Sequence, residues 1–254
     1  MPAPMPLNKR PLITAIHMAI GALLAMSPLA HADPQGGVVV GGTGSISQAG
    51  TTTTINQTSQ SMAINWQSYN VNANEHVQYL QPNSDAISLN RILSNNGSTI
   101  AGRIDANGRV ILVNPNGILF TPTASLNVGG LIASGLDIDP NDFMNGNLAF
   151  HAIDGTNGTV VNQGLINAAL GGNAALIGKQ VKNDGLIVAN LGTVTLAAGK
   201  EAVLTFDNEG LLGVKVTKAI LQEELGLDPA LINNGTIAAQ GGKVLLTASQ
   251  SQDL

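Results

Sequence analysis

The sequence contains no cysteine, few aromatic residues and few charged ones. Its 254 residues include 1 Trp, 2 Tyr and 4 Phe, and charged residues make up 11% of the chain, against about 25% in an average globular domain. The absence of Cys excludes disulfide scaffolds and Cys-ligated zinc or iron–sulfur sites. The chain also contains only 4 His, so it offers few ligands for a His-based metal site. We therefore expect neither a metal nor another cofactor.

The balance of charge is acidic, because 11 basic residues stand against 16 acidic ones and the formal net charge is −5. A nucleic-acid-binding protein needs a basic surface to neutralise phosphates, so this balance argues against a nucleic-acid partner. Disorder is disfavoured as well, because apolar residues make up 44% of the chain and run throughout it. The composition indicates a folded, weakly charged protein rich in small residues, including 30 Gly.

The first 32 residues have the three-part layout of a secretory signal peptide. Lys9 and Arg10 precede an apolar run over residues 12–29, and an Ala-His-Ala cleavage pattern ends at Ala32. We expect cleavage between Ala32 and Asp33, and export by the Sec machinery. The mature chain then has 9 basic and 16 acidic residues, a formal charge of 9 minus 16, or −7. Disulfides would obstruct a chain that crosses a second membrane unfolded, so the absence of Cys suits such a route.

Beyond the signal peptide the chain is an imperfect repeat, with 21 residues between Asn162 and Asn183. In most copies an Asn-x-Gly precedes apolar residues at alternate positions, and a later Gly begins a second alternating segment. Each segment is predicted to be a strand, because residues two apart lie on one face of a strand. Asn and Gly accept the left-handed backbone of tight turns and so mark corners. The predicted corners are Asn127, Gly129, Asn162, Gly164, Asn183, Gly185, Asn233 and Gly235.

These repeats predict an all-β fold, a parallel β-helix. Units of this size cannot bury an apolar face alone, but stacked units form a continuous core, as in other solenoids. The inward positions are Ile, Val, Leu and Ala, so the interior is narrow, and the frame of leucine-rich repeats is missing. The Asn residues at equivalent corners either stack their amides in a ladder along the axis or serve only as turn formers. Both alternatives predict the same fold.

Breaks in the repeat predict decorations of the solenoid. Residues 138–150 are rich in Asn and Asp and predict a loop, whereas residues 217–228 predict an inserted helix. Alternating segments between Val38 and Val71 predict a β cap over the open N-terminal end. The predicted organisation is a signal peptide over 1–32, the cap and first coils over 33–95, and β-helix repeats over 96–254 that end in mid-solenoid.

Candidate residues for chemistry are few. Asp137, Asp139 and Asp142 form an acidic cluster, but Asp142 stands where a calcium loop of the EF-hand type needs Gly. The Gly-rich stretch after residue 40 lacks the third Gly and the helix of a dinucleotide site. His76 and His151 lie in no nucleophile motif. We therefore predict that the protein is not an enzyme. The alternative, a β-helix that cleaves polysaccharides, would need a pair of these carboxylates.

The strongest turn signal is Asn114-Pro115-Asn116-Gly117, which lies between two very apolar segments. Pro fixes φ at the second position of a turn, and we expect Asn116 and Gly117 to adopt the left-handed conformations that follow it. A turn of this kind is typical of a sharp solenoid corner.

Together with other motifs, this turn resembles a known family. The motifs are INQTSQSMAINWQSYNV (55–71), SLNRIL (88–93), NPNG (114–117), LNVGGLIASGLDI (126–138), and the later VNQGLI and VKNDGLIVA repeats. In content and order they resemble the N-terminal secretion domain of two-partner secretion exoproteins, the filamentous haemagglutinin N-terminal domain. The similarity is greatest to the branch that contains the high-molecular-weight adhesins, and it covers roughly residues 36–213.

The resemblance implies a right-handed parallel β-helix that POTRA domains of a dedicated outer-membrane β-barrel transporter recognise in the periplasm. It implies that Asn114, Pro115, Asn116 and Gly117 are important for folding and secretion, and that the chain folds on export. The expected location is the medium or cell surface of a Gram-negative bacterium, with host-cell receptors or glycans as further partners. Family members continue as a long adhesive solenoid, so we expect either a piece of such an exoprotein or a short one. The alternative is a free-standing structural or adhesive surface β-helix that uses no transporter.

Overall fold

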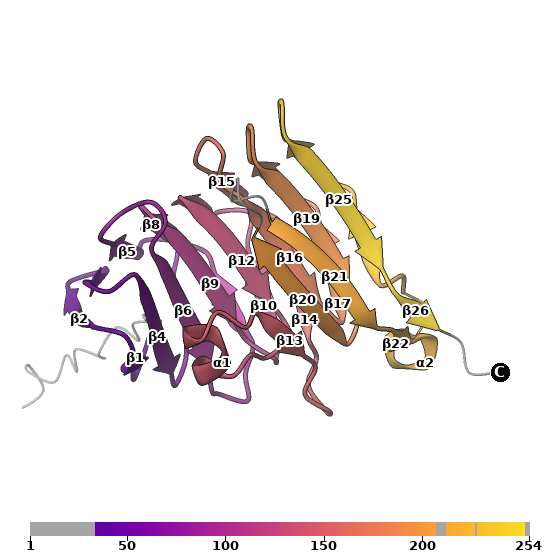
Figure 1. The fold of residues 1–254 in the computed structure, drawn as a ribbon, viewed down its shortest axis with the longest axis horizontal. Coiled ribbons are helices and arrows are strands. Elements are labelled where there is room, and N and C mark those ends of the chain that lie inside the picture. The colour runs from indigo at the N-terminus through magenta and orange to yellow at the C-terminus, as the bar shows by residue number, and fades with distance from the viewer. Residues whose placement is uncertain (1–33, 207–211, 227, 252–254) are drawn as a thin grey trace, which may run out of the picture. The chain divides into compact units, whose positions relative to one another are not determined.

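The structure, a computed structural model, describes residues 34–206, 212–226 and 228–251. The predicted signal peptide and its cleavage site between Ala32 and Asp33 lie outside these ranges. None of the helices within them is long and apolar enough to span a membrane. Strands from successive coils of the chain stack into three long sheets, which we call sheets 1, 2 and 3 (Figure 1).

Sheet 1 has eight strands in the order β1-β4-β6-β9-β12-β16-β19-β25. All of its neighbouring strands are parallel except β1, which pairs antiparallel with β4 at the N-terminal edge. The strands are β1 (Val38–Gly41), β4 (Ser61–Trp66), β6 (Ile87–Ile92), β9 (Arg109–Val113), β12 (Gly130–Ser134), β16 (Ala174–Gly178), β19 (Thr193–Ala198) and β25 (Lys243–Ala248).

Sheet 2 repeats this arrangement in the order β2-β3-β5-β8-β11-β15-β18-β24. Again only the first pair, β2 with β3, is antiparallel. The strands are β2 (Gly44–Ala49), β3 (Thr52–Gln57), β5 (His76–Leu80), β8 (Arg103–Ala106), β11 (Ser125–Val128), β15 (Leu165–Ala168), β18 (Leu186–Val188) and β24 (Thr236–Ala238). The antiparallel β1 and β2 therefore form a β cap at the N-terminal edges of both sheets.

Sheet 3 is shorter and entirely parallel, in the order β7-β10-β14-β17-β23. Its strands are β7 (Ser98–Ile100), β10 (Ile118–Phe120), β14 (Thr159–Asn162), β17 (Gln180–Asn183) and β23 (Leu231–Asn233). From β7 onward each coil passes through sheet 3, then sheet 2, then sheet 1. Parallel pairing between consecutive coils in three sheets confirms the predicted parallel β-helix.

Two long excursions leave the solenoid, and both differ from the prediction. The first holds α1 (Pro140–Met144) and β13 (Ala149–His151), so the loop predicted over 138–150 was wrong. The second holds β20 (Glu201–Phe206), β21 (Leu212–Lys218), β22 (Ile220–Leu221) and α2 (Gln222–Leu225), and β22 pairs with β26 (Gln250–Ser251). The helix predicted over 217–228 is therefore confined to four residues.

The physical reason for the second error is that pairing with distant strands outweighs local helix propensity. Lys218 pairs with Glu201 of β20, and Ile220 pairs with Gln250 of β26. These partners lie outside the sequence window in which the helical pattern was read. Strands β13, β20 and β21 form an antiparallel sheet, the outer sheet, that joins the two excursions.

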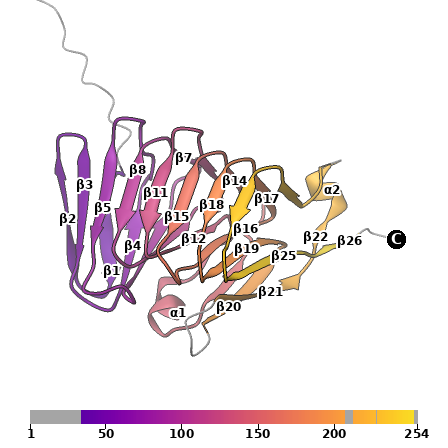
Figure 2. The same cartoon turned by 90° about the horizontal axis from the view of Figure 1, so that it is seen from above.

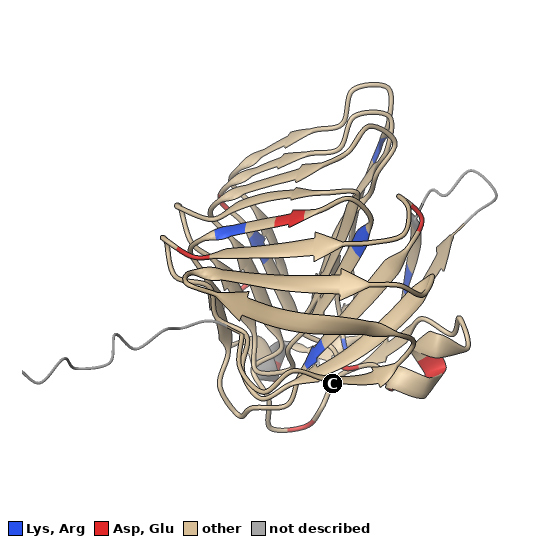
Figure 3. Ribbon diagram, turned by 90° about the vertical axis from the view of Figure 1, so that its left-hand side faces the viewer, with Lys and Arg blue, Asp and Glu red and all other residues tan. Residues whose placement is uncertain are grey.

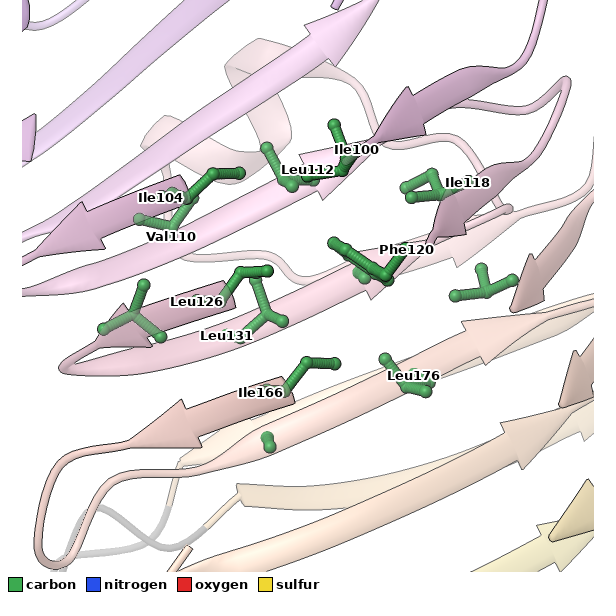
Figure 4. Close-up of a cluster of buried hydrophobic side chains, with 14 of the residues drawn as sticks. Ile100, Ile104, Val110, Leu112, Ile118, Phe120, Leu126, Leu131, Ile166 and Leu176 are labelled. Carbon is green, nitrogen blue, oxygen red and sulfur yellow. The ribbon is translucent and has the colours of Figure 1, made fainter. Parts of the chain in front are cut away.

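The side chains that point into the coils form one continuous apolar core (Figure 4). Its largest members lie in the first coils, where the rings of Trp66 and Tyr69 meet edge to face at 5.5 Å between centroids. The hydroxyl oxygens of Tyr69 and Tyr79 are 2.8 Å apart. Burial of these phenols raises the pKa of both. The interior of the later coils is filled mainly by Ile, Val, Leu and Ala, because the chain has few aromatic residues.

A second core lies on the outer face of sheet 1, under α1 and the outer sheet (Figure 2). Outward-pointing Ile111, Ile132 and Ile177 are buried there by Phe150 and Leu204, among others. Strands β9, β12 and β16 of sheet 1 are thus covered on both faces, which explains why buried residues stand at consecutive positions in them rather than at alternate ones.

Backbone contact between coils accounts for part of the high Gly content. Gly172, Gly192 and Gly242 lie at the turn from sheet 2 to sheet 1 in consecutive coils. A Cβ added at any of them would collide with the carbonyl oxygen of the Gly one coil earlier, Gly129, Gly172 or Gly192 respectively. Only Gly permits coils to stack this closely at that corner.

Candidate functional site

The predicted corner Asn residues fall into two groups. Asn162, Asn183 and Asn233 end strands β14, β17 and β23 in register, where the chain turns from sheet 3 to sheet 2. The Nδ2 of Asn162 donates to Oδ1 of Asn183 at 2.8 Å, and the Nδ2 of Asn183 donates to Oδ1 of Asn233 at 2.8 Å. Of the two alternatives for these residues, the amide ladder is the one the structure contains.

The Gly residues that follow this ladder also stack. A Cβ on Gly185 would collide with the carbonyl oxygen of Gly164, and one on Gly235 with that of Gly185. Close backbone approach therefore specifies Gly at this corner of each coil.

Asn127 does not belong to the ladder, so the corner predicted there was wrong. It lies inside β11, in register with Asp105 and Asn167 on the outer face of sheet 2. Phe120 occupies the position that is in register with Asn162. Gly129 does lie at a turn, but at the one between sheets 2 and 1. The Asn-x-Gly spacing predicts a corner in both places, because spacing in the sequence does not distinguish an Asn that ends a sheet-3 strand from an Asn inside a sheet-2 strand.

The NPNG corner, Asn114 to Gly117, connects β9 in sheet 1 to β10 in sheet 3. Asn114 is fully buried, and its Oδ1 accepts a hydrogen bond from the backbone N of Asn116 at 2.9 Å. The backbone N of Gly117 donates to the carbonyl oxygen of Asn114 at 2.9 Å and closes the turn. Gly117 has φ +105°, whereas Asn116 is not left-handed, so that part of the prediction was wrong. The Asn114 side chain already holds the Asn116 backbone, and a single left-handed residue completes the turn.

Side chains of the NPNG corner bind the preceding coil. The Nδ2 of Asn114 donates to the carbonyl oxygen of Asn96 and to Oγ of Ser98, both at 3.0 Å. The Nδ2 of Asn116 donates to the carbonyl oxygen of Ser94 at 2.9 Å.

The backbone of the NPNG corner binds coils on both sides. The backbone N of Ser98 donates to the carbonyl oxygen of Gly117 at 2.9 Å, and the backbone N of Gly158, in the next coil, donates to that of Pro115 at 2.8 Å. Of the four motif residues only Asn116 is partly exposed. The corner therefore joins three consecutive coils through its side chains and its backbone.

The acidic cluster does not converge on one point. Asp137 is buried, and its two carboxylate oxygens accept hydrogen bonds from Nε and Nη2 of Arg91, each at 2.7 Å. This hydrogen bonding raises the pKa of Arg91. The Oδ1 of Asp139 accepts from the backbone N of Asn141 at 2.7 Å and caps α1; this bond is the main cause that lowers the pKa of Asp139. Asp142 is exposed on α1.

The histidines are equally separate. His76 Nε2 lies 2.8 Å from Oδ2 of Asp105 on the outer face of sheet 2, whereas His151 lies in β13 of the outer sheet. Within the part of the chain that the structure describes, no group of three or more His, Asp or Glu side chains could hold a metal ion. Charged positions are few and scattered over the ribbon (Figure 3).

Comparison with known proteins assigns the fold to a family. A model of the TPS secretion domain, the secretion domain of two-partner secretion, matches residues 30–254. The chain belongs to the TPS secretion domain family. The crystal structure of the HMW1 secretion domain from Haemophilus influenzae is similar to it, with a TM-score of 0.74 and 33% identity over 84% of this chain and 57% of that one.

Two heme/hemopexin-binding proteins of Haemophilus influenzae are also similar to this TPS secretion domain. One is 33% identical over 223 residues, which are 85% of this chain and 23% of the relative. The other is 41% identical over 86 residues, which are 34% of this chain and 9% of the relative. This TPS secretion domain thus spans about a quarter of the length of the first curated relative.

The family match has direct consequences. TPS secretion domains belong to exported proteins that are secreted across the outer membrane, so the location is the medium or the cell surface. They are parts of exoproteins and not enzymes, which confirms that prediction. A TPS secretion domain also implies, in general, a cognate outer-membrane transporter as its partner.

Proposed function

We propose that this TPS secretion domain is recognised in the periplasm by POTRA domains of its dedicated outer-membrane β-barrel transporter and folds into the β-helix on export. A Sec-dependent signal peptide over residues 1–32 would bring the chain to the periplasm of a Gram-negative bacterium. The absence of Cys supports passage of an extended chain, because no disulfide has to be opened at the second membrane.

The observation that carries the proposal is that pairing in the solenoid is local and sequential. Each inner strand of the three sheets pairs with the coil before it and the coil after it, as Ile118 of β10 does with Ser98 and Val160. A chain that emerges from a pore segment by segment can therefore add one coil at a time to a folded edge.

The NPNG corner fits this sequential assembly. When β9 and the corner form, Asn114 and Asn116 find their partners in a coil that precedes them in the chain. The carbonyl oxygen of Pro115 then accepts from Gly158 of the following coil. We infer that the corner, once it has formed on the preceding coil, offers a hydrogen-bond acceptor to the next coil. Its residues would therefore matter for secretion.

Host-cell receptors or glycans are proposed as partners of regions of the exoprotein beyond this domain. Binding of sugar rings usually uses exposed aromatic faces. All seven aromatic side chains lie within the described residues. Phe206 is partly exposed, and the other six, Trp66, Tyr69, Tyr79, Phe120, Phe143 and Phe150, are buried.

The test is expression of the chain with and without the transporter encoded beside it, with separate assay of periplasm and medium. The proposal predicts appearance in the medium only when the transporter is present. Equal release without the transporter would support the alternative of a free-standing surface β-helix and overturn the proposal.

A further inference from the structure

The N-terminal end of sheet 2 is a free strand edge. Strand β2 is the first strand of this sheet, and among the residues that the structure describes it pairs only with β3 (Figure 1). In an antiparallel ladder, alternate residues of such an edge strand leave their N–H and C=O groups unpaired. Five of the six β2 residues are exposed. The β2 edge therefore offers backbone hydrogen bonds to a further strand.

Strand β2 lacks the features that usually prevent pairing at an edge. Natural edge strands carry charged side chains, Pro or a β-bulge, or are very short. The β2 sequence is GSISQA, and its register with β3 is unbroken from Gly44 to Ala49. The register of β1 with β4, in contrast, shifts between Val39 and Gly41, and β1 has only four residues. Of the two edges of the β cap, β2 is thus the one suited to accept a strand.

The apolar core behind the β2 edge is already covered. Ile46 is the one β2 residue that is partly buried, and it packs against the core of the coils. A Cβ added at Gly37 would collide with the side chains of both Trp66 and Ile46, so the backbone before β1 lies tightly against them. A partner at this end would therefore meet backbone groups and small polar side chains rather than an open core.

The strands of the β cap carry no charge. No Asp, Glu, Lys, Arg or His occurs between Pro34 and Asn74, a stretch that includes β1 to β4. Residues 33–254 nevertheless have 9 basic and 16 acidic residues, a formal charge of 9 minus 16, or −7, and all of these except Asp33 lie beyond Asn74. Figure 3 views the molecule from the end that carries the cap. Two copies of this acidic chain thus approach each other with least repulsion cap to cap.

We propose that the folded chain self-associates through its β2 edge, with a second copy of the chain as the partner. Two identical edges related by a two-fold axis pair antiparallel, and sheet 2 then continues across both copies. His76 on β5 is the first charged or imidazole side chain in the order of sheet 2. With strands about 4.8 Å apart, β5 and its counterpart would lie about 24 Å from each other, well beyond the Debye length of about 8 Å.

The proposed pair is weak, because six residues on each side form a small interface. We expect a dissociation constant on the order of 0.1 mM, so that pairing occurs where copies are concentrated, as on a cell surface. The inner face of sheet 2 has to stay continuous, so Ile46 or Ser47 lies on the two-fold axis. In either register the two Ser47 residues lie within about 8 Å of each other. This inference goes beyond the proposed function and does not depend on the transporter.

The first test is analytical ultracentrifugation of the purified, folded mature chain at concentrations up to about 1 mM. Ser47→Lys is compared with Ser125→Lys, which makes the same change on β11, an inner strand of sheet 2. Both side chains point away from the core, since Ile46 and Leu126 beside them pack into it. We expect Ser47→Lys to weaken association at least about tenfold, because like charges would meet across the axis, and Ser125→Lys to leave it within about twofold. Raised salt should strengthen wild-type association by screening the net charge.

A second test uses the absence of Cys from the chain. Ser47→Cys and Ser125→Cys each introduce a single thiol, and a short bis-maleimide should link two copies at least about tenfold faster through Ser47→Cys, because pairing holds those thiols close together. Circular dichroism establishes that every variant is folded.

Three results would overturn the inference: a wild type that stays monomeric at about 1 mM, a folded Ser47→Lys variant that associates like the wild type, or equal cross-linking of the two Cys variants. None of them touches the proposed function, which fails only if secretion does not require the transporter.

Discussion

The guanidinium of Arg91 and the carboxylate of Asp137 form two hydrogen bonds of 2.7 Å, although the residues are 46 positions apart in the chain. Arg91 lies in β6 of sheet 1, and Asp137 lies at the start of the first excursion. The Asp137 side chain is 6% exposed and the Arg91 side chain 24%. This ion pair therefore fixes the excursion on the outer face of sheet 1, over the second core.

Arg91→Met is expected to destabilise the protein by about 2–3 kcal/mol, because it leaves the Asp137 carboxylate buried without its partner. The measurement is the free energy of unfolding in urea. Arg103→Met is the control, because Arg103 pairs with Asp105 but is 60% exposed and should contribute less than about 1 kcal/mol. Equal losses in the two variants would contradict the role given to the Arg91–Asp137 pair.

The lowered pKa of Asp139 predicts that the stability of the protein depends on pH. Its pKa is lowered in the folded state, chiefly by the hydrogen bond from the backbone N of Asn141. Its contribution is therefore fully present above the unfolded pKa of about 3.9 and is lost as the pH falls through the lower folded value. The stability difference between the wild type and Asp139→Ala should be constant near neutral pH and shrink below about pH 4. A difference that does not change between pH 7 and pH 3 would contradict this cause.

The amide ladder predicts a larger effect at its centre than at an outer-face Asn. Asn183 is buried and bonded to Asn162 on one side and Asn233 on the other. Asn183→Ala should cost about 2 kcal/mol of unfolding free energy, because it also leaves the Asn162 amide without its acceptor. Asn167→Ala removes one bond of 3.2 Å from a partly buried pair and should cost less than about 1 kcal/mol. The reverse order would show that the Asn residues act only as turn formers.

Substitution of Gly192 by Ala is expected to create a steric clash without straining the backbone conformation. Its φ is not positive, but a Cβ there would collide with the carbonyl oxygen of Gly172. Gly192→Ala should therefore cost about 3 kcal/mol, or prevent folding, because the coils must separate. Gly155→Ala is the control, since Gly155 has φ +77° and nothing within 4 Å of an added Cβ. It should cost about 1 kcal/mol for the left-handed backbone alone. Similar losses in thermal or urea unfolding would contradict close coil stacking.

The solenoid itself could be predicted from the sequence because its determinants are local. Alternation of apolar residues defines a strand within a few residues, and Asn or Gly defines a corner within two. The pairs Asn162 with Gly164 and Asn183 with Gly185 illustrate this, since both lie at the turn from sheet 3 to sheet 2.

The excursions could not be predicted, because distant partners determine them. β21 is a strand because β20 pairs with it, and Asp137 is buried because Arg91 binds it. One local signal for the outer sheet was present. The run Val110–Val113 is apolar at consecutive positions, which is typical of a strand covered on both faces.

Gly117 provides the most direct test of coil-by-coil folding during secretion. Gly117→Ala and Gly155→Ala both place Ala at a positive φ, +105° and +77° respectively, but only Gly117 lies in the NPNG corner. With the transporter present, the fraction of each variant in the medium is compared with that in the periplasm. We predict that Gly117→Ala, alone or with Asn116→Ala, accumulates in the periplasm, whereas Gly155→Ala reaches the medium at the wild-type level. Equal extracellular yield of the wild type, Gly155→Ala and both variants that carry Gly117→Ala would contradict a role of the NPNG corner in secretion.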